Sequence, residues 1–442
     1  MKSLKLLLRF LTVGGLVLLL LIPLSMIRGT IQERKSYRAE ATDRIASSSA
    51  GEQQVMAPLR VVPWTDTKEV EYTDNRGVLR KRVESANGTL LQAPSTLELQ
   101  GEIVPDIRKL GLFEVRVYSW RAHLSATFDP ALPAPANKFT RTYGTPYLLF
   151  GVSDVRGLVG TPNLRVDGRA LRFEPGTRHY AETINGVSAT LPAVTGDAAP
   201  GRKVEMEFVL AGTESLSIVP VGDSNRIAVQ SKWRHPSFAG DFLPTQRKIH
   251  PQDRGFEAHW DISSLASQAQ GQIQRIATRD TEIESLRISL VDPVDVYTQA
   301  DRASKYGILF VLLTFVGFAL FELIKRLPIH PMQYLLVGLA LAIFFLLLLS
   351  LSEHIAFWQA YLVSSAACIG LQFAYLSGVL KSWGRAGGFA AMLTALYGVL
   401  YSLLVSEDNA LLMGSLLLFG ILATIMWITR KVDWYQLGAS LR

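Results

Sequence analysis

The chain has 442 residues, of which 49% are apolar and 19% are charged, and its formal net charge is +7. The charged fraction lies below the figure of about 25% that is typical of soluble proteins, and the apolar residues concentrate near both ends of the chain. These features exclude a single soluble domain, a disordered chain and a collagen-like fibre, and the single cysteine excludes a disulfide framework within the chain.

The first apolar segment covers residues 10–27 and carries no charge. It is long enough to span a bilayer core of about 30 Å as a helix. The basic residues Lys2, Lys5 and Arg9 precede it, and the run is long for a signal peptide and lacks a small-residue cleavage site. An uncleaved anchor with residues 1–9 in the cytoplasm is therefore predicted, whereas cleavage would leave five spans. Residues 27–47 are predicted to continue as a polar, solvated helical stalk.

Residues 28–305 form the predicted exported domain. Short β-rich runs between Leu59 and Lys232 alternate with turn residues every 8 to 12 positions, a spacing that is typical of an all-β sandwich or barrel-like module. The loops 130–137 and 196–201 are predicted to divide this large domain. Residues 263–287 have a helical composition, and Leu286–Val291 is predicted to be a strand.

Five further apolar segments are long enough to span a bilayer: residues 306–324, 334–351, 355–380, 389–405 and 410–428. Lys and Arg occur in the loops after the second, fourth and sixth spans, while the loops with Glu353 and Glu407 have none. The positive-inside rule therefore predicts six spans with both termini, including residues 429–442, in the cytoplasm. The predicted fold is a membrane protein of the α+β class, in which a large mainly-β domain is inserted between helices 1 and 2 of a six-helix transmembrane region.

Four basic residues oppose the positive-inside rule. Arg28, Arg34, Lys35 and Arg38 follow the first span on the exported side. A long exported domain translocates largely regardless of its charge, so the predicted orientation stands. Outside residues 28–305 the chain has ten Lys and Arg against five Asp and Glu. Most of the excess positive charge of the chain therefore reflects the orientation of the spans in the membrane and does not indicate nucleic-acid binding.

The sequence offers no recognisable catalytic or cofactor motif. Its seven histidines have no metal-binding spacing, and Walker A, nucleophile-elbow and Rossmann patterns are absent, so no cofactor, no metal and no catalytic residue are predicted. Cys368 lies in the middle of a span and is interpreted as a packing residue, because an apolar setting keeps a thiol protonated and inert.

Glu322 is the one ionisable residue within a predicted span. An intramembrane acid is a functional hypothesis by default, here a proton site of a transporter. Glu322 lies one turn from the cytoplasmic end, close to Lys325 and Arg326, which favours snorkelling and local pairing. The other spans offer few polar residues and no continuous polar line, so the pattern does not support transport.

Two clusters outside the spans are candidate sites. Trp233, His235, Phe238, Asp241 and Phe242 lie within a proline-flanked loop, which either binds a ligand through its aromatic anchors or, as the favoured interpretation, folds back onto the core of its own domain. His235 and Asp241 are also the acid–base candidates of an anchored hydrolase.

The second cluster consists of His330, Gln333 and Tyr334 at the start of the third span. Pro331 suits the first turn of a helix, and Tyr334 suits the aromatic belt at a membrane interface. The favoured interpretation of this membrane-interface cluster is anchoring.

Several long segments of the chain resemble the CreD family of bacterial inner-membrane proteins: LSIVPVGDSN, WRHPSFAGDFLP, PVDVYTQADRASKYGILFVLLTF and HPMQYLLVGLALAIFFLLLLSLSEHIAF, with LLLLIPLSMIRGTIQERKSYR, GVSDVRG and FEPGT. The resemblance covers nearly the full length. It implies an inner-membrane location, with residues 28–305 in the periplasm, and a role in envelope integrity and in responses to β-lactams and colicins. It brings no catalytic residues with it.

The leading functional hypothesis is a non-catalytic membrane protein that binds or organises an envelope component through its periplasmic domain. The partner would be the lipid bilayer together with an envelope protein, peptidoglycan or a lipid. The alternatives are a small-solute or proton-coupled transporter and a membrane-anchored periplasmic hydrolase. The oligomeric state is left open.

Overall fold

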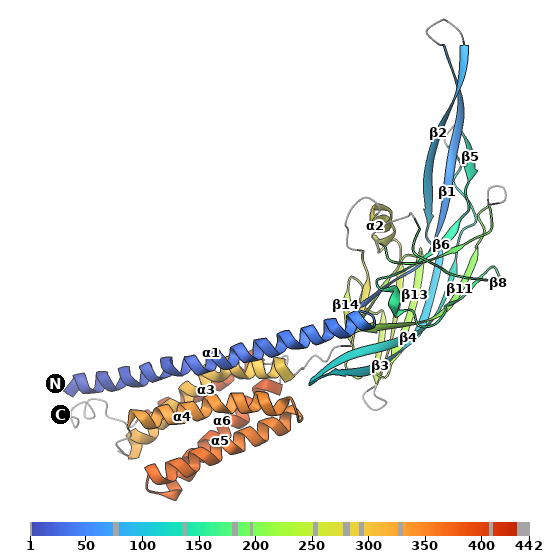
Figure 1. The fold of residues 1–442 in the computed structure, drawn as a ribbon. Coiled ribbons are helices and arrows are strands. Elements are labelled where there is room, and N and C mark those ends of the chain that lie inside the picture. The colour runs from blue at the N-terminus through green and yellow to red at the C-terminus, as the bar shows by residue number, and fades with distance from the viewer. Residues whose placement is uncertain are drawn as a thin grey trace. The chain divides into compact units, whose positions relative to one another are not determined.

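The computed structural model describes residues 2–73, 79–135, 139–178, 184–194, 198–250, 255–276, 283–290, 296–325, 330–405 and 410–430. These residues form two compact units (Figure 1). The helical unit contains Met1–Ala39 and Val294–Arg442, and the β unit contains Glu40–Pro293. The prediction that long apolar helices are combined with a large β-sheet region is confirmed.

The helical unit is built from long helices: α1 (Lys2–Ser48), α3 (Val296–Lys325), α4 (Pro331–Ser352), α5 (Phe357–Val379), α6 (Trp383–Val405) and α7 (Ala410–Thr429). Within the described residues, α1, α3, α4, α5 and α6 are long and apolar enough to cross a membrane. Helix α7 covers the predicted sixth span, and its membrane assignment stays a prediction. Helix α1 is unbroken, so residues 27–47 extend the helix that begins in the first span.

Aromatic side chains fill the core of the helical unit. Phe344 of α4 packs edge-to-face on Tyr361 of α5 and Tyr397 of α6, with ring centroids 5.4 and 4.7 Å apart. Phe310 of α3 lies 4.7 Å from the same Tyr397 ring. These contacts join four helices, and edge-to-face pairs of this kind add to the packing energy of the buried rings.

Gly338 of α4 lets α1 approach closely. A Cβ atom at this position would overlap the side chain of Leu20 and would lie 3.0 Å from the Phe315 ring of α3. Small residues at helix interfaces allow such close packing in membranes.

We expect Gly338→Leu to destabilise the helical unit by about 1–3 kcal/mol, because the larger side chain overpacks the contact with Leu20. Gly338→Ala should be mild, since the overlapping atom ends a flexible side chain. Gly370→Leu is the control, because Gly370 of α5 has open space around its Cα. Thermal unfolding of the full-length protein in detergent measures all three, and an equal effect of the two leucine variants would contradict the contact.

The β unit is a two-layer sandwich. Sheet A has the order β14-β17-β12-β1-β6-β10-β9, with β2 and β5 also paired to β1. Its strands are β1 (Gln53–Thr73), β2 (Leu79–Gln92), β5 (Thr140–Tyr143), β6 (Tyr147–Val152), β9 (Glu174–Pro175), β10 (Gly186–Thr190), β12 (Ser215–Val219), β14 (Ser237–Gly240) and β17 (Leu286–Ser289).

Sheet B has the order β15-β16-β13-β3-β4-β11-β7-β8. Its strands are β3 (Thr96–Leu110), β4 (Phe113–Thr127), β7 (Asn163–Val166), β8 (Arg169–Leu171), β11 (Lys203–Thr213), β13 (Ser224–Ser231), β15 (Gln246–His250) and β16 (Gly255–Ser263). Phe150 of sheet A and Phe208 of sheet B pack edge-to-face at 5.2 Å, so the two sheets share one core. Trp120 and Trp260 are its largest fully buried side chains.

The elements differ from the sequence prediction in three places. Strand β1 is far longer than the predicted strand at Leu59, because its second half pairs with β2 in a hairpin that extends beyond the sandwich (Figure 1). Among the described residues of the predicted helical region 263–287, the short helix α2 (Ala269–Ile276) is the helical part. The loops 130–137 and 196–201 do not divide the domain, since Ala131 pairs with Ala198 within one compact unit.

Candidate functional site

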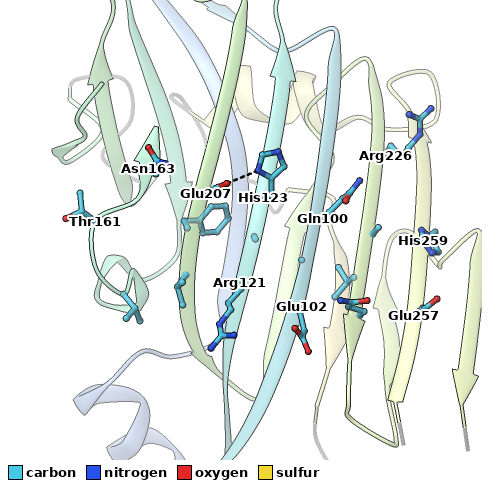
Figure 2. A pocket seen from close by; sticks show the side chains of 18 residues that line it. Gln100, Glu102, Arg121, His123, Thr161, Asn163, Glu207, Arg226, Glu257 and His259 are labelled. Carbon is cyan, nitrogen blue, oxygen red and sulfur yellow. Dashed lines mark ion pairs between the residues drawn. The ribbon is translucent and has the colours of Figure 1, made fainter. Parts of the chain in front are cut away.

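The open face of sheet B carries a groove of about 1010 Å³, which is lined by both polar and apolar residues. Its polar lining comes from Gln100, Glu102, Arg121, His123, Thr161, Asn163, Glu207, Arg226, Gln230, Glu257 and His259, most of which Figure 2 labels. We call this feature the sheet-B groove. It lies wholly within the β unit.

Alternation along the strands creates this face. In β3, Leu97, Leu99 and Ile103 point into the core, whereas Gln100 is exposed on the other side. In β4, Trp120 and Leu124 are buried while Arg121 and His123 are exposed. Because successive side chains of a strand point to opposite faces, each strand contributes both to the core and to the groove.

Strand register aligns the groove side chains in a row that runs across six strands. The row passes from His259 in β16 through Ala228, Gln100, His123 and Glu207 to Asn163 in β7. With neighbouring strands about 4.8 Å apart, it is about 24 Å long. His123 Nδ1 and Glu207 Oε1 are 3.8 Å apart, the contact that is dashed in Figure 2. Ala228 is the smallest member, so it deepens the row beside His259.

A second row lies beside the first. It places Glu257, Gln230, Glu102 and Arg121 on neighbouring strands. Carboxylates therefore alternate with an amide and a guanidinium across this row. The two rows together present hydrogen-bond donors and acceptors along the whole groove.

The segment after β6 forms one wall of the groove, with Val159 and Thr161 among its lining residues. The short 3₁₀ helix η1 (Val155–Gly157) begins at Asp154, whose carboxylate accepts a hydrogen bond from the Arg156 N–H at 3.0 Å. Side-chain hydrogen bonds from Arg156 also lower the pKa of Asp154. A Cβ at Gly157 would overlap the Ala211 carbonyl of β11, so glycine lets this wall pack tightly against sheet B.

The groove chemistry suits a neutral or mixed-charge ligand with many hydrogen-bonding groups. Amides, imidazoles and carboxylates make up most of its polar lining, and Arg121 and Arg226 offset part of the acidic charge. Arg226 is held by Glu98 at 2.8 Å and by Asp261 at 3.6 Å. Within the described ranges, no group of three or more His, Cys, Asp or Glu side chains is arranged to hold a metal ion.

The aromatic residues of the predicted binding loop lie against the domain's own core. Phe238 packs edge-to-face on Phe256 and Trp260, with centroids 5.5 and 5.7 Å apart. The Trp260 Nε1 donates to the Phe242 carbonyl at 3.2 Å, and Trp233 and Phe242 are partly buried against the same core. The structure thus agrees with the interpretation of a loop that folds back.

The polar residues of that loop are separate from one another. His235 is exposed, and its carbonyl accepts a hydrogen bond from Trp233 Nε1 at 2.8 Å. The Asp241 carboxylate accepts the Ser285 N–H at 2.9 Å, which fixes the start of β17. No hydrogen bond or ion pair joins His235 to Asp241 in the described part of the chain, so the hydrolase alternative gains no support.

Glu322 belongs to helix α3, and its side chain lies outside the described residues. In the membrane-interface cluster, His330 and Gln333 form a capping box at the start of α4. His330 Nδ1 accepts the Met332 N–H at 3.3 Å, and Gln333 Oε1 accepts the His330 N–H at 3.2 Å. Tyr334 is 3% exposed and packs on Phe318, so its ring lies within the bundle rather than on a lipid-facing belt.

The helical unit holds a buried polar cluster around Cys368 that the sequence did not reveal. Cys368 Sγ accepts hydrogen bonds from Gln372 Nε2 at 3.4 Å and from the Tyr397 hydroxyl at 3.1 Å. Its thiol donates to the Ala340 carbonyl at 3.3 Å. Ser364 lies on the same buried face of α5. Cys368 thus packs against polar groups rather than against an apolar surround alone.

The sheet-B groove could not be located from the sequence. The alternation of polar and apolar residues in Thr96–Ile103 and around His123 was its one local signal. That pattern indicates a half-buried strand without revealing its neighbours. The row depends on the parallel pairing of β3 with β13, which are more than a hundred residues apart in the sequence.

A family model described as inner membrane protein CreD matches residues 5–435. The inner membrane protein CreD of Escherichia coli (strain K12) is 38% identical over 426 residues, which cover 95% of this chain and 92% of the E. coli protein. The resemblance found in the sequence is thereby confirmed. The chain belongs to the CreD family and is a multi-pass inner membrane protein.

Proposed function

We propose that this chain is a non-catalytic membrane protein that supports cell envelope integrity by binding peptidoglycan in the sheet-B groove. The observation that carries the proposal is the row of hydrogen-bonding side chains from His259 to Asn163. This role would account for a part in envelope stress and in responses to β-lactams and colicins.

The length and chemistry of the groove favour a linear polymer. A row of about 24 Å that crosses six strands matches an extended chain better than a compact solute. The hydroxyl and N-acetyl groups of a glycan strand would pair with amides such as Gln100, Asn163 and Gln230. A protein partner would instead favour aromatic and apolar anchors, which are enriched at the centre of protein interfaces.

The proposed topology places the β unit in the periplasm. Six spans, with α7 as the last, and both termini in the cytoplasm explain the distribution of Lys and Arg among the short loops. Interactions between α1, α3 and α4 support the alternation of sides. Arg34 of α1 forms an ion pair with Glu353, which directly follows α4, and the hydroxyl of Tyr297 of α3 donates a hydrogen bond to the same carboxylate. The exported end of α1 thus lies beside the start of α3 and the end of α4.

We expect the full-length protein in detergent to co-sediment with isolated peptidoglycan sacculi. The double variant Gln100→Ala, Asn163→Ala should lose most of this binding, because it removes two amides from one row. The same variant should fail to restore β-lactam or colicin resistance to cells that lack the gene. Both residues are exposed, so the β unit should keep its unfolding temperature.

Gln274→Ala is the matched control, because Gln274 is an exposed amide on α2 that does not line the groove. It should bind sacculi as the unmodified protein does. Equal co-sedimentation of the control and the double variant would reject the groove as the binding site. A photo-crosslinker placed at position 100 that captures only a protein would show a protein partner and overturn the peptidoglycan assignment.

A further inference from the structure

The basic residues that oppose the positive-inside rule meet acidic residues of neighbouring helices. Arg34 Nε lies 3.5 Å from Glu353 Oε1, which also accepts a hydrogen bond from the Tyr297 hydroxyl at 3.3 Å. Lys35 Nζ lies 3.6 Å from Asp301 of α3. These pairs explain two of the four cations that follow the first span. All residues of these pairs belong to the helical unit.

The pairing around Asp301 leaves an excess of positive charge. Lys305 Nζ approaches the same carboxylate to 2.9 Å, and Arg28 also acts on it electrostatically. Three cations therefore share one carboxylate, and Glu353 is already engaged by Arg34. Arg302 of α3 lies three residues before Lys305, on the same side of the helix, and adds a further positive charge there. Its Nη1 is buried and has no hydrogen-bond partner among the residues that the structure describes.

We call Arg28, Lys35, Asp301, Arg302 and Lys305 the Asp301 cluster. It contains four cations and one carboxylate. A buried guanidinium nitrogen without an acceptor is costly, because its desolvation is not repaid by a hydrogen bond. Among the residues that the structure describes, the cluster therefore lacks one anionic, oxygen-rich partner. A phosphate group has the charge and the acceptor oxygens that lysine and arginine together bind well.

The position of the cluster in the helices indicates where that phosphate comes from. Arg28 directly follows the first predicted span, and Lys305 directly precedes the second. Arg302 lies four residues before residue 306, about 6 Å along the helix axis. The headgroup layer on each side of the hydrocarbon core is about 5–8 Å thick. The cluster thus lies at the depth of phospholipid phosphates.

We propose that the Asp301 cluster binds the phosphate of an anionic phospholipid in the leaflet that faces the β unit. The phosphate accepts hydrogen bonds from Arg302 and Lys305, and the surplus charge favours an anionic lipid over a zwitterionic one. The lipid thereby fixes the middle of α1 and the first turns of α3 at the membrane surface. This site is independent of the peptidoglycan groove and adds a lipid-binding role to the helical unit.

Native mass spectrometry of the full-length protein tests the site. The protein is reconstituted in nanodiscs of phosphatidylcholine mixed with phosphatidylglycerol and then released into detergent. We expect retained phosphatidylglycerol in preference to phosphatidylcholine. Arg302→Gln and Lys305→Gln should each reduce this preference about fivefold, the effect of one cation near a charged membrane surface. Arg302→Lys should keep part of it, because it retains the charge without the planar fork.

The control is Arg44→Gln, which removes the same charge from α1 about 24 Å beyond Arg28. It should retain phosphatidylglycerol as the unmodified protein does. Unchanged lipid preference in the double variant Arg302→Gln, Lys305→Gln would overturn the site. Inorganic phosphate added to the protein in phosphatidylcholine nanodiscs should not raise its unfolding temperature. An increase that the double variant abolishes would reject the lipid and assign the site to free phosphate.

Discussion

Replacing Arg60 with leucine is expected to destabilise the β unit by about 3 kcal/mol or more. Arg60 of β1 has no exposed surface, and its guanidinium donates to Gln92 Oε1 at 2.9 Å, to the Pro200 carbonyl at 3.0 Å and to the Asp129 carbonyl. Leucine would leave three partly buried acceptors without their donor, and a buried acceptor without a partner costs about 1–3 kcal/mol. The loss of the cation above the Phe128 ring, 5.1 Å from its centroid, adds to the effect.

Arg60 keeps its charge in the fold. Burial lowers the pKa of its guanidinium to about 10, with Asp129 and Asp167 opposing the shift. The side chain therefore remains protonated at neutral pH and holds three segments together: the end of β2, the segment after β4 and the segment before β11. Arg60→Lys should give an intermediate loss, because one ammonium cannot reproduce the fork of donors.

Urea unfolding of the full-length protein in detergent measures this loss, with hydrogen–deuterium exchange reporting on residues 92, 129–131 and 198–202. Arg226→Leu is the control. Arg226 is exposed and pairs with Glu98 and Asp261, so its removal should cost less than about 1 kcal/mol. If Arg60→Leu and Arg226→Leu unfold at the same urea concentration, the proposed role of Arg60 is wrong.

The contacts of Arg60 also explain why the predicted division of the exported domain was wrong. The proline- and glycine-rich loops 130–137 and 196–201 have the composition of linkers. Composition reports local flexibility, whereas the buried Arg60, which lies 69 residues before Asp129 and 140 residues before Pro200, donates hydrogen bonds to the carbonyls of both. Such long-range polar contacts leave no local signal in the chain.

The helices and strands were predictable to different degrees for a physical reason. A membrane helix is specified by its own apolar length, so the segments at 334–351 and 389–405 correspond to α4 and α6. A strand depends on its neighbours. The polar second half of β1 becomes a strand because β2 pairs with it from Arg60 to Thr73, a fact that is absent from either segment alone.

The candidate sites divide along the same line. The aromatic loop at Trp233 was conspicuous because its residues are close in sequence, yet its rings fill the core. The sheet-B groove and the Asp301 cluster were invisible because their members come from several distant strands or helices. A run of similar residues is visible in the sequence because its members are close together. A binding surface depends instead on strand register and helix packing, which bring distant residues together.

Acidification is expected to loosen the base of the β1–β2 hairpin through Asp66. Arg141 of β5 binds the Asp66 carboxylate with both Nε and Nη2, at 2.7 and 2.8 Å. The same guanidinium donates to the Pro133 carbonyl at 3.1 Å and lies 4.4 Å from the Trp64 ring centroid. The pair thus joins β1, β5 and the loop that precedes β5 at the point where the hairpin leaves the sandwich.

The sign of the pH effect follows from the carboxyl group. Hydrogen bonds from Arg141 hold the pKa of Asp66 below its ordinary value, and burial opposes them only in part. Because the folded-state pKa lies below the unfolded value, the pair contributes fully above about pH 4. Its contribution is lost as the pH falls through the folded-state pKa. Hydrogen exchange at residues 64–67 and 140–143, corrected for intrinsic rates, should therefore rise several-fold in strong acid.

Asp66→Asn should show the faster exchange already at pH 7, because a neutral amide cannot form the charged two-point contact with Arg141. Its exchange should then depend little on pH. Glu69→Gln is the control, since Glu69 is exposed and approaches Lys81 at 3.4 Å farther along the hairpin. That variant should keep the pH response of the unmodified protein. If Asp66→Asn keeps that response as well, another group controls the base of the hairpin, and the pair at Arg141 is not the acid-sensitive contact.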